Sequence, residues 1–113
     1  MNVMKYSAEF AAKENLDRYE NLANAIVLQA AMDYKKAILH LKWNPMDRNW
    51  KGEIKRILEF FKSDWYCVLT GVDSRLILGE MERQAEKEWP AFRKRMIELG
   101  KQKSAREKNK KEG

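Results

Sequence analysis

The stretch from Phe60 to Ile77 combines two helix starts, one helix stop and the densest apolar content of the chain. Ser63 predicts a helix N-cap, because its hydroxyl can accept from the free backbone N–H groups of the next turn. Asp64 then places a carboxylate at the positive end of the helix dipole. Gly71 predicts the left-handed residue that closes this helix, and Asp73 predicts a cap for the following one. A short helix at a sharp corner is therefore expected, its inner side lined by three apolar residues: Trp65, Leu69 and Val72.

A long helical pattern precedes this corner. Residues 8–43 contain no proline or glycine, and their apolar residues fall on one broad side of a helix. At about 1.5 Å per residue such a helix could exceed about 50 Å. This is more than a chain of 113 residues needs for a globule. We therefore expect either a break near Asn15 or a protruding first part, and an end at the tight turn Asn44-Pro45.

The second expected helix, over residues 45–62, has the most regular amphipathic pattern in the chain. Asn44 and Asp47 are placed to cap its start. Its apolar residues recur at helical spacing and predict the core, whereas the opposite side is basic. The core set is Trp50, Ile54, Ile57, Leu58 and Phe61, and the basic set is Lys51, Lys55, Arg56 and Lys62.

A third long helix is expected over residues 74–88, with Leu76, Ile77, Met81 and Ala85 on its buried side and Gly79 at a close helix contact. Trp89-Pro90 should interrupt or kink it, and a short final helix should stop at Gly100. From Lys101 onward no large apolar residue remains, so this end should be disordered or fray as a polar helix. The sequence thus predicts an all-α bundle of a long helix, an antiparallel helix, a short corner helix and a third long helix, with a single domain at 1–100 and a basic tail at 101–113.

Composition limits the class of protein. With 113 residues and 44% hydrophobic content, the chain fits one small domain with a single core. Its first ten residues lack the pattern of a secretory signal, and no window has the continuous apolar run of a membrane span. The single cysteine, Cys67, cannot form an internal disulfide and is expected to be a buried small apolar residue. We therefore expect a soluble, cytoplasmic protein.

Catalytic patterns are absent from the sequence. It has no glycine-rich phosphate loop, no metal-ligand cluster, and no nucleophile beside a base. Asp64 and Asp73 are interpreted as helix caps instead of paired catalytic carboxylates. The lone histidine, His40, is expected to be a partly exposed imidazole near a helix end. We expect no enzyme, no cofactor and no metal.

The formal net charge of +6 is unevenly distributed. Residues 42–62 carry six basic against three acidic residues, and residues 101–113 carry six against two. Such a chain could bind nucleic-acid phosphates without reading bases, with a log–log salt slope of about −5 for six tail charges on duplex DNA. The alternative is a tail that only solubilises the protein. The residues for phosphate binding are Lys51, Lys55, Arg56, Lys62, Arg93, Lys94, Arg95, Lys101, Lys103, Arg106, Lys108, Lys110 and Lys111.

The four tryptophans, four tyrosines and four phenylalanines are many for so small a core. Some should lie near the surface, where tryptophan, tyrosine and arginine are the usual anchors of interfaces. The candidate partner-binding residues are Trp43, Arg48, Tyr66 and Trp89, with packing in the core or at its rim as the alternative. A long first helix with a broad apolar side also needs a cover, either a second copy of the chain or a partner helix.

The run Phe60-Phe61-Lys62-Ser63-Asp64-Trp65-Tyr66, followed by Leu69-Thr70, Val72-Asp73 and Leu76-Ile77, resembles a segment of small, largely uncharacterised phage and prophage proteins of low-GC Gram-positive bacteria. In those proteins a helix ending in an Asn-Pro turn usually comes first, as Asn44-Pro45 does here. The resemblance covers residues 26–80. It departs at Ser74, where a glycine commonly follows the aspartate, so capping here does without a special backbone geometry.

The resemblance implies an accessory protein of a mobile element that regulates or inhibits a host or phage machine, and it implies no catalytic residues. Together with the residues above, it predicts a non-catalytic protein that binds a macromolecular partner, a protein or a protein–nucleic-acid complex, through an aromatic-basic helical surface. The alternative is a nucleic-acid-binding protein without sequence preference, using the basic tail and the lysines of the second helix.

Overall fold

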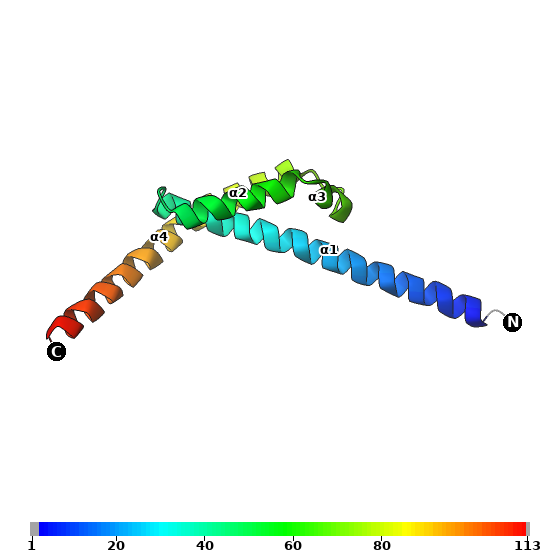
Figure 1. The fold of residues 1–113 in the computed structure, drawn as a ribbon, viewed down its shortest axis with the longest axis horizontal. Helices are drawn as coiled ribbons and strands as arrows, with labels where there is room; N and C mark the ends of the chain where they lie inside the picture. The colour runs from blue at the N-terminus through cyan, green and yellow to red at the C-terminus, as the bar shows by residue number, and fades with distance from the viewer. Residues whose placement is uncertain (1–2, 113) are drawn as a thin grey trace.

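The computed structural model describes the backbone of residues 3–112 and the side chains of residues 20–104. The described residues form four helices and no strand: α1 (Val3–Trp43), α2 (Arg48–Lys62), α3 (Asp64–Leu69) and α4 (Ser74–Glu112). The expected all-α fold is confirmed. The molecule is elongated, with extents of 82 × 34 × 24 Å, and both long helices run beyond the bundle (Figure 1). No helix in the described part is both long enough and apolar enough to cross a membrane.

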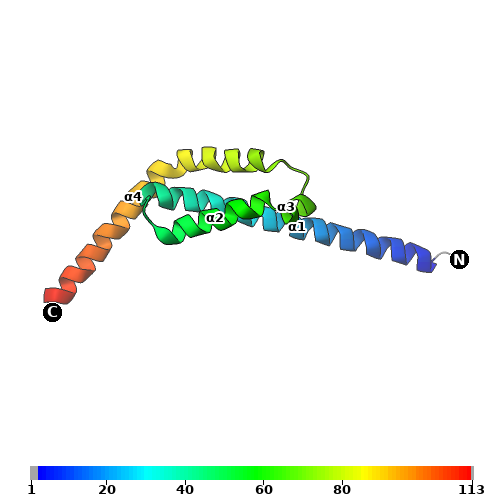
Figure 2. The same ribbon diagram turned by 45° about the horizontal axis from the view of Figure 1, so that its top comes forward.

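Helix α1 is the spine of the bundle. Figure 2 shows α2 and the first part of α4 on either side of its C-terminal half, and α1 contacts α2, α3 and α4. α2 runs antiparallel to α1, and α4 then runs in the same direction as α1 (Figure 1). The N-terminal half of α1 extends past the other helices without a break, because nothing in residues 8–43 interrupts a helix. Of the two alternatives for this helix, the structure has the protruding one.

The main core lies where α1 meets α2 and α3, and apolar residues of the first part of α4 pack against it. Small residues on α1, namely Ala23, Ala31 and Ala37, allow the helices to approach closely, and larger residues from the other helices fill the space between them. Ile57 and Phe61 are buried, as expected for the second helix. The full buried set is Ala23, Val27, Ala31, Tyr34, Ala37, Ile57, Phe61, Tyr66 and Leu69.

A second, smaller cluster joins α1 to α4. It consists of Leu39, Ala85 and Phe92, with Ala85 fully buried. A polar contact supports the same pairing of helices, because the hydroxyl of Tyr34 donates to the Glu82 carboxylate at 2.7 Å. Burial raises the pKa of the Tyr34 hydroxyl above its ordinary value. The buried hydroxyl thus keeps its proton and remains a donor.

Four residues connect α1 to α2 in the expected tight turn. The Asn44 side chain accepts from the backbone N–H of Met46 at 3.2 Å, and Asp47 is the N-cap of α2, its carboxylate accepting from the N–H of Trp50 at 3.2 Å. Asp47 therefore satisfies one of the free donors at the helix start. The turn therefore fixes the positions of Trp43, the last residue of α1, and Arg48, the first residue of α2.

The corner begins as expected and ends differently. Ser63 caps α3, its hydroxyl accepting from the N–H of Tyr66 at 3.2 Å. Thr70 ends the helix in an extended conformation, with its N–H donating to the Tyr66 carbonyl at 3.1 Å. No described glycine has a positive φ, so the left-handed closure at Gly71 was wrong. The chain leaves α3 as an extended segment, which any residue can form.

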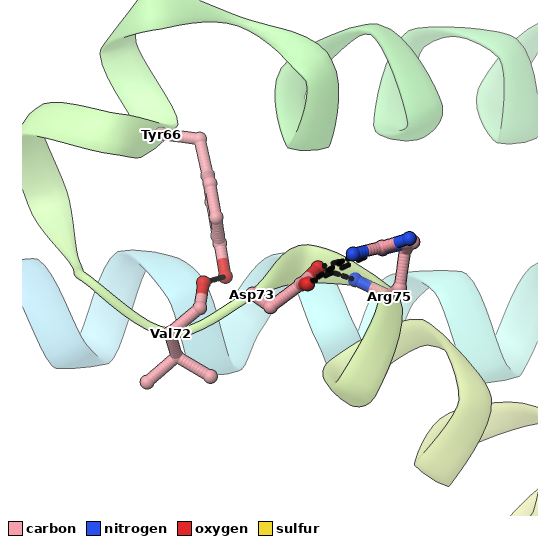
Figure 3. A network of polar contacts seen from close by, with 4 residues as sticks. All are labelled: Tyr66, Val72, Asp73 and Arg75. Carbon is pink, nitrogen blue, oxygen red and sulfur yellow. Dashed lines mark hydrogen bonds and ion pairs between the residues drawn. The ribbon is translucent and has the colours of Figure 1, made fainter.

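The inside of the corner is occupied by Tyr66 and Leu69, both buried. Figure 3 shows the Tyr66 hydroxyl reaching across the corner to the Val72 carbonyl, to which it donates at 2.7 Å. Trp65 is 54% exposed and Val72 48% exposed, so of the three residues expected inside only Leu69 is there. Because α3 is a single short helix, turning Tyr66 and Leu69 inward turns Trp65 and Cys67 outward. Cys67 is exposed, and the expectation that it is buried was wrong.

Helix α4 departs most from expectation. It passes through Pro90 and Gly100 to Glu112, so there is no separate final helix and no stop at Gly100. Figure 2 shows that α4 bends in its yellow-to-gold part. A proline inside a helix removes one backbone donor and crowds the preceding turn, which kinks the helix without ending it. Leu76 is exposed, and a Cβ added at Gly79 would meet nothing within 4 Å, so these two expectations were also wrong.

The basic tail continues α4 as helix over residues 101–112. Of the two expected states for this segment, disorder and a polar helix, the described backbone has the helical one. The side chains beyond residue 104 lie outside the described residues. The division between a domain at 1–100 and a tail at 101–113 stays a prediction.

Asp73 caps α4 and makes the stability of the corner depend on pH. Its Oδ1 accepts from the Arg75 backbone N–H at 2.9 Å, and its Oδ2 lies 2.7 Å from Nη2 of the Arg75 guanidinium (Figure 3). These hydrogen bonds hold the pKa of Asp73 at about 2, below its ordinary value of 3.8. Because the pKa is lowered in the folded state, the ionised carboxylate stabilises the fold above about pH 4, and this contribution is lost as the pH falls through about 2.

Replacing Asp73 with asparagine should therefore lower stability at neutral pH, and the difference from the parent protein should shrink towards pH 2. Urea unfolding followed by circular dichroism at a series of pH values measures it. Glu59→Gln, which removes an exposed acidic group from α2, controls for the change in net charge. A difference between D73N and the parent that stays constant down to pH 2 would contradict this role of the carboxylate.

Candidate binding surface

A cluster of aromatic and basic residues gathers at the end of the bundle where α1 ends, α2 begins and α4 crosses both. We call it the aromatic-basic end. Its residues come from three helices and from segments far apart in the sequence. They are Lys36, His40, Lys42, Trp43, Arg48, Trp50, Trp89 and Phe92.

His40 is the centre of this cluster. Its ring stacks on Trp50 of α2 with centroids 4.2 Å apart and an interplanar angle of 7°, and it meets the edge of Phe92 of α4 at 5.1 Å. Burial lowers the pKa of His40, and the positive charge of Lys36 lowers it further, while Asp47 acts in the opposite direction. The imidazole is thus neutral at pH 7 and serves as an aromatic spacer between three helices. It is partly exposed, as expected, but its partners are rings and not the helix dipole.

Two lysines of α1 lie over tryptophan rings at this end. Nζ of Lys42 is 5.4 Å from the ring centre of Trp89, and Nζ of Lys36 is 5.8 Å from that of Trp50. A cation over an indole ring is attracted by its negative face, an interaction of about 0.5–1 kcal/mol where water has access. Trp89 also stacks against Phe92, with centroids 6.0 Å apart. The arrangement holds aromatic rings and positive charge together at this end of the bundle.

Three of the four candidate partner-binding residues belong to this end. Trp43 and Arg48 stand on either side of the capped turn, with Trp43 40% exposed and Arg48 exposed, and Trp89 is half-buried under Lys42. Tyr66 lies at the opposite corner of the bundle and is 3% exposed. Its ring packs against Phe60 and Phe61, so it has no surface to offer a partner, and it was wrongly included.

The residues expected to bind phosphates fall on two helices. Lys51, Lys55, Arg56 and Lys62 are exposed along α2, and Arg93, Lys94, Arg95, Lys101 and Lys103 are exposed along α4. Arg56 forms an ion pair with Glu53. Both helices leave the aromatic-basic end in diverging directions (Figure 1), so the two sets meet only near that end. The side chains of Arg106, Lys108, Lys110 and Lys111 lie outside the described residues.

Sequence reasoning missed Lys36, Lys42 and the role of His40. The signal was present, because Lys36, His40 and Trp43 recur at i, i+4 and i+7 on the last turns of α1 and share one side of it. What the sequence did not show is that α4 brings Trp89 and Phe92 to the same place. Within the described residues no three His, Cys, Asp or Glu side chains are grouped as metal ligands.

Comparison with known proteins does not identify this surface. No family model, no curated protein and no solved structure matches the chain.

Proposed function

We propose that this protein is a non-catalytic accessory protein that binds an acidic macromolecular partner through its aromatic-basic end. The observation that carries the proposal is the exposure of Trp43 and Arg48 on either side of a turn fixed by two capping side chains, at the end of the bundle where Lys42 lies over Trp89. Rigid aromatic rings beside arginine form the usual energetic centre of an interface. The surrounding lysines favour a partner that carries negative charge.

The resemblance of residues 26–80 to phage and prophage proteins supports the same proposal. The resemblance implies an accessory protein that regulates or inhibits a host or phage machine, and such action needs a binding surface and no reaction of its own. The resemblance names no partner. A protein, or a protein–nucleic-acid complex, with an acidic surface fits the charge of this end.

An affinity experiment with paired variants tests the proposal. The chain is immobilised and exposed to a bacterial lysate at about 0.15 and 0.5 M salt, with nuclease in parallel. Trp43→Ala with Arg48→Glu should weaken capture of the recovered partner by about 30-fold or more, because anchor residues contribute about 2 kcal/mol or more each. The matched control is Trp65→Ala with Lys62→Glu, an exposed tryptophan and a basic residue at the other end of the bundle. Equal loss in both variants, or in neither, would count against the aromatic-basic end.

Direct binding to nucleic acid is the second candidate function. It is favoured by the exposed basic residues Arg93, Lys94, Arg95, Lys101 and Lys103 on the part of α4 that runs away from the bundle. In the same experiment this function predicts capture that disappears with nuclease and at about 0.5 M salt, because released counterions dominate such binding. It also predicts loss of capture when the chain ends at Gly100, whereas the first function predicts that capture survives all three.

A further inference from the structure

An apolar stripe runs along the outer side of α1. It passes from Ala25, which lines a hollow beside α2, to Leu28 and Met32, which line hollows beside α4. Leu22 is 60% exposed, Leu28 61% and Met32 48%, and Ala25 is exposed between them. Positions 22, 25, 28 and 32 share one side of a helix over about three turns. Exposed leucines are common singly, but a contiguous apolar stripe is typical of a contact surface.

The stripe leads into a groove between α1 and α4. This groove, with a volume of about 600 Å³, begins beside Met32 and is bounded by Lys36 and Leu39 of α1 and by Glu88, Phe92 and Arg95 of α4. It follows the axis of α1 away from the stripe and towards the aromatic-basic end.

The same chain contains a helix without a neighbour. The N-terminal half of α1 extends beyond the bundle, and no other helix of the described residues 3–112 runs beside it (Figures 1 and 2). A helix of roughly 20 residues is marginally stable in water unless another element packs against it. One copy of the chain therefore presents both a groove that lacks a helix and a helix that lacks a cover.

The charges of α1 select the orientation in which two copies can meet. Residues 8–17 contain three acidic residues and one basic residue, and residues 33–42 contain three basic residues and one acidic residue. If two α1 helices pack antiparallel about Ala25, the acidic segment of each lies opposite the basic segment of the other. A parallel pairing would set like charges together. Complementary charge of this kind fixes the orientation more than the affinity.

We propose that the protein is a homodimer in which two α1 helices pack antiparallel about a two-fold axis near Ala25. The stripe of each copy lies on that of the other, and the free half of each α1 fills the groove of its partner. Ala25 is small and allows close approach at the axis, while Leu22 of one copy lies near Leu28 of the other. At about 1.5 Å per residue, each Trp43 is about 27 Å from the axis, so the two aromatic-basic ends are about 50 Å apart and face opposite ways. The dimer does not depend on the proposed function.

Sedimentation equilibrium of the full chain tests the association. At about 50 µM the expected mass is twice the 13.4 kDa of one chain. Leu28→Glu with Met32→Glu should raise the dissociation constant by about 100-fold or more, because it places charges in an apolar contact. The matched control is Trp65→Glu with Val68→Glu, two exposed apolar residues of α3, which should leave the dimer intact. A monomer at this concentration, or equal dissociation of both variants, would overturn the proposal.

Cysteine cross-linking tests the orientation, and it keeps the proposal testable if the glutamate variants fold poorly. In a Cys67→Ser background, Ala25→Cys should form a disulfide-linked dimer under mild oxidation at least about tenfold faster than Lys55→Cys, on the basic side of α2. A mixture of Leu22→Cys and Leu28→Cys chains should give mainly the mixed dimer. Preferred linkage of Leu22→Cys chains to one another would show a parallel pair, and equal rates for Ala25→Cys and Lys55→Cys would show random collision. Either result would contradict the two-fold arrangement.

Discussion

Replacing Phe61 with alanine is expected to lower the free energy of unfolding by about 3–5 kcal/mol. Phe61 is 2% exposed at the centre of the main core, where its ring centre lies 5.3 Å from that of Phe60 and 5.4 Å from that of Tyr66. Truncation removes the buried area of the ring and leaves a cavity between α1, α2 and α3. A small domain has about 5–15 kcal/mol of stability in total, so this variant should be close to unfolding.

Urea denaturation followed by tryptophan fluorescence or circular dichroism measures the change. Trp65→Ala is the matched control, because it truncates an aromatic residue that is 54% exposed on α3. It should change the free energy of unfolding by about 0.5 kcal/mol or less. A loss for Trp65→Ala as large as that for Phe61→Ala would contradict the buried position of Phe61 and the exposed position of Trp65.

The corner shows how far local signals can determine structure. Ser63 and Asp73 cap their helices as expected, because capping depends on a side chain and on backbone groups two or three residues away. Which side of α3 faces inward depends on contacts with α2 and also with α1, which is distant in sequence. Tyr66 is inside because its hydroxyl reaches the Val72 carbonyl and its ring meets Phe60. Trp65 has a larger apolar surface than Tyr66, so residue type alone predicted, wrongly, that Trp65 faces inward.

Helix ends in α4 were mispredicted for a related reason. Pro90 and Gly100 lower the intrinsic preference for helix, yet α4 continues through both. Ala85 and Phe92, on either side of the proline, both pack against Leu39, so tertiary packing holds α4 as one helix across the kink. The second helix was predicted well, since its regular pattern and the cap at Asp47 agree with one another.

The sequence predicts the residue composition of the candidate site, but only part of its position in the fold. Aromatic excess and basic charge predicted a surface of that composition. Trp43, Arg48 and Trp89 lie at one end of the bundle, and their role in binding a partner stays a prediction. The sequence could not show that His40 joins three helices there, because its partners Trp50 and Phe92 come from other elements. It also could not show the exposed stripe of α1, since Leu28 and Met32 look the same in sequence as the buried residues beside them.

Replacing Ala85 with glutamate should detach the first half of α4 from α1 and lower the free energy of unfolding by about 3–5 kcal/mol. Ala85 has no exposed surface and packs with Leu39 and Phe92 in the smaller cluster, where a longer charged side chain has no room. The matched control is Ala91→Glu, which makes the same replacement at an exposed position of the same helix and should cost under about 1 kcal/mol. Since α4 brings Trp89 to the aromatic-basic end, Ala85→Glu should also raise the exposure of Trp89 and His40, measurable by fluorescence quenching and by proton NMR of the imidazole. An Ala85→Glu protein that unfolds like Ala91→Glu, with His40 unchanged, would contradict the packing of α4 on α1 and would separate Trp89 from the surface proposed to bind the partner.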